Sequence, residues 1–141
     1  MHGNLSILTG KFTDDELYLT LKMHPEKEID LKMYQEANYF QIHKLYFKRS
    51  FLGYVVLFLG HHSLEKNDVL IDDIGFLRDE TLLEPLMFKM LKRIKEQKVF
   101  SVPLEDIYYE PSKFDSIYQE MFHSLGFRED DRSYVGHNCC R

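Results

Sequence analysis

The sequence predicts one α+β domain, with elements in the order strand, one or two helices, three strands, helix, strand, helix, strand. At 141 residues, with 44% hydrophobic residues, the chain is long enough for one core and too short for two ordinary domains. Apolar residues recur at three- and four-residue spacing in some segments and form aromatic or β-branched runs in others. Capping motifs and turn residues separate these segments.

The N-terminal part is predicted to form a strand followed by two helices. Residues 5–8 are apolar enough for a first strand. Thr13 and Glu16 form a capping box, which satisfies free backbone N–H groups at the start of a helix. Pro25 stops this helix. A weaker second helix is expected over residues 28–37, where apolar residues gather on one side.

A hairpin and a third strand are expected next. Residues 39–47 are rich in aromatic and β-branched side chains, and residues 51–59 are apolar on both faces, as expected for a strand in the middle of a sheet. The polar residues 48–50 form the turn between them. Residues 69–77 form the third strand.

Two acids and a capping box stand in and after this third strand. Because side chains alternate along a strand, Asp72 and Asp73 are expected on opposite faces. Thr81 and Glu84 form a second capping box, which begins the next helix.

The stretch from residue 107 to residue 127 has the clearest local pattern. A short aromatic strand over residues 107–110 is followed by Ser112, which is expected to cap a helix with Asp115 three residues on. Gly126 is a suitable left-handed residue behind the helix, and Phe127 can fold back on its last turn. The apolar face of the helix is formed by Phe114, Ile117, Tyr118, Met121, Phe122 and Leu125.

This stretch resembles the C-terminal signature of the GCN5-related N-acetyltransferase family, in which a strand is followed by Asn, Ala, Tyr and a terminal Leu-Gly-Phe. Asp115, Tyr118 and Phe122 stand at the positions of the Asn, the Ala and the Tyr, without a gap. Residues 71–76, Ile-Asp-Asp-Ile-Gly-Phe, look like the central strand of the family, and the order of elements extends the resemblance over nearly the whole chain. The resemblance implies a central mixed, mostly antiparallel sheet of about six strands, flanked by three or four helices.

In this family acetyl-CoA lies between the central strand and the strand after it, which splay apart. The resemblance therefore implies that Ile74, Gly75 and Phe76 on the central strand, and Asp115 and Phe122 near the last helix, bind the cofactor. The family also holds the pyrophosphate on a glycine-rich loop at a helix N-terminus.

The expected phosphate loop of this chain differs from the family pattern. Residues 77–85 contain no glycine; Asp79, Glu80 and Glu84 bring negative charge to an anion site, and Pro85 removes one N–H donor. Arg78 alone could partly compensate. This composition argues against binding of acetyl-CoA in the manner of the family.

Two residues are candidates for proton transfer. Asp72 aligns with a carboxylate that some family members use, through water, as the general base. The family tyrosine that protonates the thiolate is Phe122 here, so Tyr118, one turn earlier, is the candidate acid, with Tyr108 or Tyr109 as alternatives. The alternative for the tyrosines is packing in the core, and for Asp72 it is an exposed or edge-facing acid.

Two functions follow from the resemblance. The first is an acyl-CoA-dependent N-acetyltransferase with an atypical cofactor loop, whose acceptor is an amine of an unidentified small molecule or protein. The second is a non-catalytic protein of the same fold that binds a small molecule or a partner protein. A third reading, an unrelated α+β binding domain, would follow if the strands around Phe76 and Ile107 were not neighbours.

Charge and composition exclude several other classes. A net charge of −5 argues against a nucleic-acid-binding protein, which needs a basic surface to displace counterions. No apolar run is long enough to cross a membrane, and the start has no secretory leader, so a cytoplasmic protein is expected. The two cysteines are adjacent, and His61-His62 lack a third ligand, so no metal site is predicted. The sequence is compatible with a homodimer.

Overall fold

The structure is a computed structural model that describes residues 5–59, 69–77, 83–96, 98–99, 102–103 and 107–127. Its main sheet has five strands in the order β1-β2-β3-β4-β7, and every neighbouring pair is antiparallel except β4 and β7, which are parallel. This confirms the mixed, mostly antiparallel sheet. The strands are β1 (Leu5–Thr9), β2 (Phe40–Phe47), β3 (Ser50–Phe58), β4 (Val69–Phe76) and β7 (Ile107–Tyr109).

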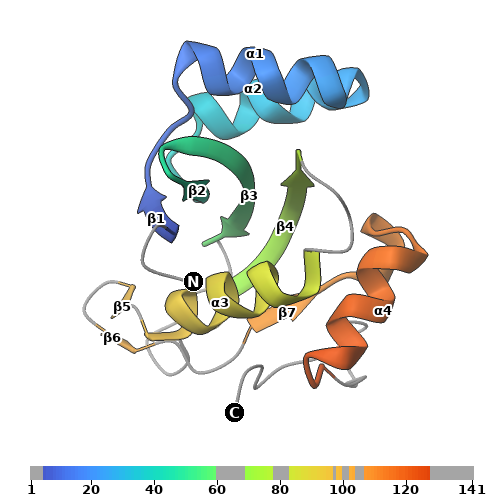
Figure 1. Ribbon diagram of the computed structural model, residues 1–141. Helices are drawn as coiled ribbons and strands as arrows, with labels where there is room; N and C mark the ends of the chain where they lie inside the picture. Colours follow the sequence, from blue (N-terminus) through green and yellow to red (C-terminus); the bar gives the residue numbers. More distant parts are fainter. Residues whose placement is uncertain are drawn as a thin grey trace.

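In the described part of the chain, four α-helices are present, and they cover the two faces of the sheet (Figure 1). The helices α1 (Asp14–Met23) and α2 (Glu28–Glu36) lie side by side on one face, and α3 (Leu83–Glu96) and α4 (Ser116–Ser124) lie on the other. Residues 134–138, predicted as a final strand, lie outside the described residues. The expected number of helices is confirmed.

Four short elements complete the described chain. The 3₁₀ helices η1 (Pro25–Lys27) and η3 (Pro111–Lys113) each begin with a proline. The strands β5 (Lys98–Val99) and β6 (Val102–Pro103) pair with each other in a separate two-stranded sheet. The sequence pattern predicts only a linking segment there, because two-residue strands are too short to show alternation.

The capping box at the start of α1 is confirmed. The Thr13 hydroxyl accepts a hydrogen bond from the Glu16 N–H at 3.2 Å, and the Glu16 carboxylate accepts one from the Thr13 N–H at 2.9 Å. Glu16 also accepts hydrogen bonds from the Lys44 ammonium and the Tyr46 hydroxyl on β2. The box therefore fixes the start of α1 and also attaches that start to the sheet.

The hairpin of β2 and β3 is confirmed, with a tighter turn than expected. Lys48 and Arg49 have φ angles of 48° and 69°, which suit a two-residue hairpin loop. Ser50, expected in the turn, is the first residue of β3 and pairs with Phe47.

The start of the last helix differs from the prediction. Ser112 lies inside the 3₁₀ helix η3, and Asp115 is the N-cap of α4, accepting a hydrogen bond from the Tyr118 N–H at 3.4 Å. The reason is Phe114, whose extended backbone (φ −128°, ψ 142°) separates the two helices. The end of the helix is as expected: Gly126 has φ 97°, and the Phe127 N–H donates to the Phe122 carbonyl at 3.0 Å.

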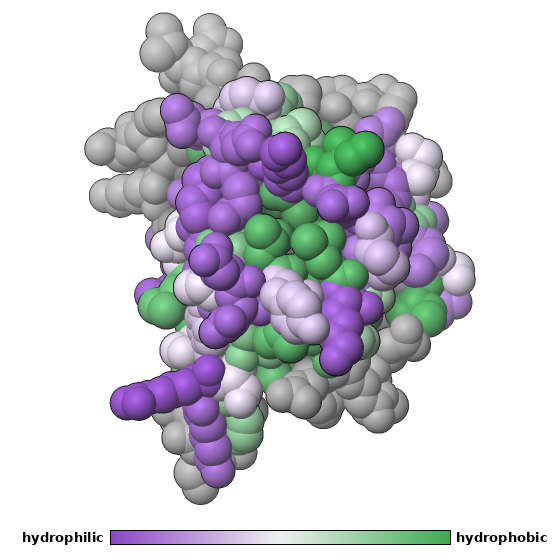
Figure 2. All heavy atoms as spheres, turned by 90° about the horizontal axis from the view of Figure 1, so that it is seen from above, coloured by the Kyte–Doolittle hydropathy of each residue, from purple (hydrophilic) through white to green (hydrophobic). Residues whose placement is uncertain are grey.

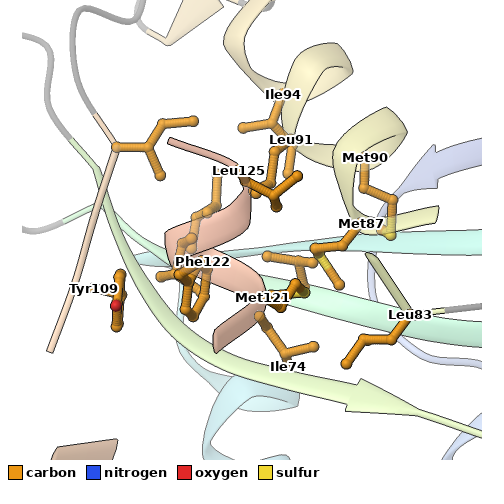
Figure 3. Close-up of a cluster of buried hydrophobic side chains, with 14 of the residues drawn as sticks. Ile74, Leu83, Met87, Met90, Leu91, Ile94, Tyr109, Met121, Phe122 and Leu125 are labelled. Atoms are coloured by element: carbon orange, nitrogen blue, oxygen red, sulfur yellow. The ribbon is translucent and has the colours of Figure 1, made fainter. Parts of the chain in front are cut away.

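Two apolar clusters fill the spaces between the layers. The larger cluster lies between the sheet and the helices α3 and α4 (Figure 3). At its centre the Phe122 ring stacks on Tyr109, with ring centroids 3.8 Å apart. The second cluster lies under α1 and α2 and contains Phe12, Leu31, Tyr34, Phe40, Ile42, Phe51, Tyr54 and Val56.

A β-bulge in β4 corrects the prediction for its two acids. Ile71 pairs with Leu57 and Asp73 pairs with Val56, so Asp72 is an extra residue without a partner on β3. A bulge interrupts the alternation of side chains. Ile71 and Ile74 therefore lie in the same cluster, and Asp72 and Asp73 both point to the side of α1 and α2, not to opposite faces.

Candidate active site

The strands β4 and β7 part shortly after they meet. They pair only at Val69 with Ile107, Leu70 with Tyr108 and Ile71 with Tyr109. Beyond this point β7 ends, while β4 continues from Asp72 to Phe76, and no described strand pairs with it on that side. We call this unpaired side of Asp72–Phe76 the open edge of β4.

Two residues of β4 direct their backbone groups to the open edge. The Leu77 N–H donates to the Leu52 carbonyl of β3 at 2.8 Å, so Leu77 faces β3. Because backbone groups alternate in direction along a strand, Gly75 also faces β3, whereas Ile74 and Phe76 face the open edge. An extended molecule lying along this edge would find backbone donors and acceptors there.

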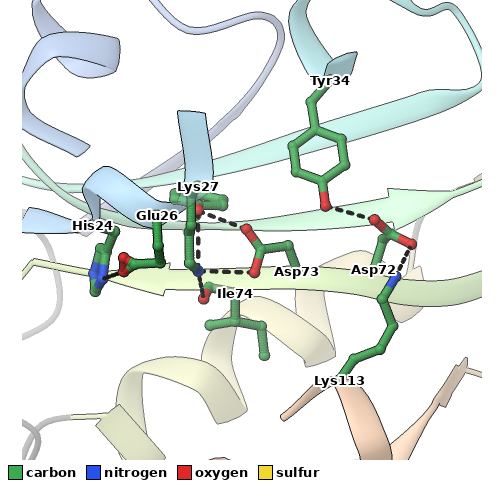
Figure 4. Close-up of polar contacts among 9 residues, drawn as sticks. His24, Glu26, Lys27, Tyr34, Asp72, Asp73, Ile74 and Lys113 are labelled. Atoms are coloured by element: carbon green, nitrogen blue, oxygen red, sulfur yellow. Dashed lines mark hydrogen bonds and ion pairs between the residues drawn. The ribbon is translucent and has the colours of Figure 1, made fainter. Parts of the chain in front are cut away.

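The carboxylate of Asp72 lies where the two strands separate (Figure 4). It accepts a hydrogen bond from the Tyr34 hydroxyl at 2.6 Å and forms an ion pair with the Lys113 ammonium at 2.7 Å. The Asp72 side chain is 12% exposed and the Lys113 side chain 40% exposed. These two contacts join β4 to α2 on one side and to η3 on the other.

Asp73 forms a second set of polar contacts beside the first. Its carboxylate accepts hydrogen bonds from the Tyr54 hydroxyl at 2.8 Å and from the Lys27 ammonium at 2.9 Å. The same ammonium donates to the carbonyl of Ile74 at 2.9 Å and lies 3.5 Å from the Tyr54 hydroxyl. A lysine side chain from η1 therefore reaches a backbone carbonyl of the open edge.

Gly75 allows the Tyr54 ring to lie against β4. A Cβ atom at residue 75 would lie 2.1 Å from one ring carbon of Tyr54 and 2.6 Å from its hydroxyl oxygen. Only glycine leaves this space free, and the ring then directs its hydroxyl to Asp73. Burial, together with the negative charge and the hydrogen bond of Asp73, raises the pKa of Tyr54 far above its ordinary value.

The two remaining tyrosines of the site differ in their environment. Burial, and then the hydrogen bond to Asp72, raises the pKa of Tyr34 well above its ordinary value, so this phenol stays a donor. Tyr118 on α4 is half-buried and contacts the Phe114 ring, with centroids 6.1 Å apart.

The structure brings some of the predicted site residues together and separates others. Asp72, Ile74 and Phe76 lie along the open edge of β4, although the side chains of Ile74 and Phe76 pack in the larger core cluster, whereas the backbone of Gly75 faces β3. Asp115 caps α4. Phe122 is fully buried, so in this conformation its ring offers no surface to a ligand and serves packing. Arg78 lies outside the described residues.

The sequence reasoning did not identify Lys27, Tyr34, Tyr54 and Lys113 as site residues. A signal for the two lysines was present: each is the third residue of a turn that begins with proline, Pro25-Glu26-Lys27 in η1 and Pro111-Ser112-Lys113 in η3. Proline at the first helical position fixes φ and favours such a turn. The tyrosines carried no such signal, because an aromatic residue in an apolar stripe usually belongs to the core.

The open edge suits an extended chain with amides, whereas the start of α3 does not suit an anion. The open edge offers the outward backbone groups of Ile74 and Phe76 to amides of an extended chain. At the start of α3, in contrast, Glu84 is exposed in the first turn and Pro85 lacks an N–H, and both features disfavour an anion. Residues 78–82, which precede this helix, lie outside the described residues.

Apolar and acidic side chains lie together on the face formed by α1 and α2. Viewed from above, this face shows hydrophobic atoms surrounded by hydrophilic ones (Figure 2). Leu19, Met23, Ile29 and Met33 are among the exposed apolar side chains of these helices. The first turn of α1 is acidic. Among the described helices, none is long and apolar enough to span a membrane.

Comparison with solved structures identifies the fold to which this sheet order and helix arrangement belong. The chain has the fold of the GCN5-related N-acetyltransferases. The protein YhhK from E. coli, solved bound to coenzyme A, superimposes with a TM-score of 0.69 at 16% identity, over 96% of this chain and 98% of YhhK.

Two further solved structures show the same fold. The Campylobacter jejuni N-acetyltransferase PseH, in complex with acetyl coenzyme A, matches with a TM-score of 0.62 at 12% identity, over 97% of this chain and 99% of PseH. A Bacillus subtilis acetyltransferase in complex with CoA matches with a TM-score of 0.57 at 22% identity, over 88% of this chain and 76% of that protein. Comparison with models of known protein families gives no match, and comparison with curated proteins gives none either.

Proposed function

We propose that the protein is a divergent GCN5-related enzyme, an acyl-CoA-dependent N-acetyltransferase that transfers an acyl group to an amine. The observation that carries this proposal is the open edge of β4. In the described part of the chain, a parallel neighbour that leaves after three paired residues leaves one side of β4 without a neighbouring strand, between two layers of helices. Backbone groups on such a side need another partner, and an extended ligand with amides can supply one.

The acyl arm would lie along the open edge. The outward N–H and C=O groups of Ile74 and Phe76 would hold its amides as a neighbouring strand would. Three proteins of the same fold support this assignment, because YhhK and the B. subtilis enzyme are bound to CoA and PseH is bound to acetyl-CoA. When bound, acetyl-CoA supplies an activated carbonyl group for attack by an amine.

Asp72 and Tyr118 are proposed to move the protons. Asp72 would take the proton of the acceptor amine through a water molecule, while Tyr34 and Lys113 hold its carboxylate in position. Tyr118 would return a proton to the thiolate, because Phe122 has no hydroxyl and is fully buried. The exposed apolar side chains and the acids of α1 and α2 suit an acceptor that combines a cationic amine with an apolar part, from a small molecule or a protein.

Isothermal titration of the full chain with CoA and with acetyl-CoA tests the binding step. Glu84→Gln should strengthen binding by about two- to fivefold, since it removes an exposed like charge near the diphosphate. Glu84→Gly should strengthen it at least as much. Glu96→Gln removes the same charge from the other end of α3 and should leave binding unchanged. Absence of heat with millimolar CoA would refute the proposal.

The chemical step is tested by release of free thiol from acetyl-CoA in the presence of a panel of amines. Asp72→Asn and Tyr118→Phe should each lower kcat by about 100-fold or more while CoA binding is retained, as expected for loss of a general base or acid. Asp15→Asn, an exposed acid on α1, should leave the rate unchanged. Equal rates for all three variants would show that Asp72 is not the general base and that Tyr118 is not the general acid.

A second candidate is a non-catalytic protein of the same fold that binds a small molecule or a protein. It is favoured by one observation: Lys113 and Tyr34 already occupy oxygens of the candidate base Asp72. CoA binding without thiol release, for any amine in the panel, would select this candidate over the enzyme.

A further inference from the structure

The ammonium of Lys27 is held at the open edge of β4 by three oxygens. Its distances are 2.9 Å to Asp73 Oδ1, 2.9 Å to the Ile74 carbonyl and 3.5 Å to the Tyr54 hydroxyl. The Lys27 side chain is 20% exposed. The amine is therefore partly shielded from solvent and fixed in position beside the backbone that would hold an acyl arm.

The contact with Ile74 distinguishes Lys27 from the other lysine of the site. A lysine reaches a strand carbonyl most easily where no strand pairs with it, and no described strand pairs with the outward side of Ile74. Lys113 binds the carboxylate of Asp72 and is 40% exposed. Of these two lysines, Lys27 is the one whose ammonium binds a backbone carbonyl of the open edge.

Asp73 stands beside Lys27 as a proton acceptor. Its Oδ1 atom accepts the hydrogen bond from the Lys27 ammonium, and Oδ2 accepts the one from the Tyr54 hydroxyl. An ammonium must lose a proton before its nitrogen can attack a carbonyl carbon. The arrangement of amine and carboxylate is that of a nucleophile with its base.

We propose that Lys27 is itself acetylated by this site, in an inference that rests on the proposed function. With an acetyl thioester along the open edge, the Lys27 nitrogen forms a bond to the thioester carbonyl carbon, and the carbon–sulfur bond breaks with its electron pair on sulfur. The ammonium loses two protons in total. One passes through Asp73 to solvent and the other ends on the thiol of CoA.

The product is a neutral acetamide at Lys27, one per chain. It can no longer form the ion pair with Asp73, and it stays beside the open edge where an amine acceptor would approach. Self-acetylation would therefore lower transfer to other amines after a single event in each molecule, which makes Lys27 a control point of the same site.

The first measurement is mass spectrometry of the full chain after incubation with acetyl-CoA, with peptide mapping. We expect one acetyl group on Lys27, formed at a rate per molecule that does not depend on protein concentration. Positioning should favour Lys27 by at least about tenfold over Lys22, an exposed lysine of α1. Incubation with CoA should add no acetyl group.

Two variants with matched chemistry define the site. Lys27→Arg keeps the positive charge beside Asp73 and removes the nucleophile, so it should stay unmodified. Lys32→Arg, at an exposed lysine of α2, is the control and should be acetylated at Lys27 as in the unaltered protein. As a readout independent of catalysis, acetylated protein freed of ligand should unfold at a lower urea concentration than unmodified protein, because Asp73 has lost its ion pair.

Titration with CoA separates the possible failures. If CoA does not bind, the proposed function and this inference fall together. If CoA binds and Lys27 stays unmodified, or is modified no faster than Lys22, this inference alone is overturned. Acetylation of Lys113 in place of Lys27 would also overturn it.

Discussion

Replacing Gly75 by alanine places a methyl group where the Tyr54 ring lies. The new Cβ would be 2.1, 2.4 and 2.6 Å from Cε1, Cζ and Oη of Tyr54, all far inside van der Waals contact. The ring is 1% exposed and packs on Phe12 in the smaller core cluster, so it cannot simply turn outward. We expect the ring to shift and the hydrogen bond to Asp73 to break.

The free energy of unfolding should fall by about 3–5 kcal/mol in Gly75→Ala. Overpacking of a dense core costs about 1–3 kcal/mol, and loss of a hydrogen bond to a charged group adds roughly 1.5–3 kcal/mol. Urea unfolding followed by circular dichroism measures the change. In a domain of ordinary stability this is a large fraction of the total.

A double-mutant cycle isolates the contact from other effects of the methyl group. Tyr54→Leu lacks the three clashing atoms, so Gly75→Ala in that background should cost less than about 1 kcal/mol. Gly53→Ala is the control, because its Cβ would meet the Gly75 carbonyl oxygen at 2.5 Å, and that cost should persist in the Tyr54→Leu background. Equal costs of Gly75→Ala in both backgrounds would refute the reasoning.

Three further predictions concern the core and the caps. Burial lowers the pKa of His43 from 6.5 to about 4 in the folded protein. Between these two pH values the unfolded chain binds a proton at His43 and the folded protein does not. The free energy of unfolding should therefore fall by roughly 3 kcal/mol as the pH decreases from 6.5 to 4. His43→Phe should flatten urea midpoints over this range, and an equally steep loss in the variant would contradict it. Asp115→Ala should lower the free energy of unfolding, measured with urea, by about 1 kcal/mol, and Ser112→Ala should lower it by less than about 0.5 kcal/mol, because Asp115 is the N-cap of α4. A larger effect of Ser112→Ala would indicate that Ser112 is the cap, as the sequence predicts. Phe122→Tyr adds a hydroxyl to a fully buried ring stacked on Tyr109 and should lower the thermal midpoint, at a cost of about 1–3 kcal/mol; an unchanged midpoint would show space for the hydroxyl.

Local chemistry made much of the fold predictable. The capping box of Thr13 and Glu16, the hairpin around residue 48 and the glycine end of α4 each depend on residues close in sequence. Such signals are complete within a few residues, so no tertiary information is needed. The contact of β4 with β7 was expected from the family resemblance, and it removes the reading as an unrelated α+β domain.

The errors arise where one residue changes the phase of a pattern. The bulge at Asp72 reverses the faces of all later side chains of β4 relative to those before it. The sequence of β4 contains no signal for this bulge. The extended backbone of Phe114 is a local break of the same kind, and it moves the cap of α4 from Ser112 to Asp115. Such breaks are decided by packing against neighbouring layers.

The site residues that escaped prediction share a different property. Lys27 and Lys113 reach the two acids from turns far away in the chain, and Tyr34 arrives from α2. Sequence spacing describes neighbours along one element, and these contacts join different elements, so only the assembled structure could bring them together.

The polar contacts at the open edge also have a consequence for the order in which the chain folds. They join residues 46, 41 and 38 positions apart, in the pairs Lys27–Asp73, Lys113–Asp72 and Tyr34–Asp72. The hairpin of β2 and β3 closes over two residues and costs far less chain entropy. We therefore expect the sheet to form around its local hairpin first and these polar contacts to close late, after the folding barrier. Changes at these pairs would alter how fast the protein unfolds and leave its folding rate almost untouched, so the chemistry of the site can vary without hindering the folding of the chain that carries it.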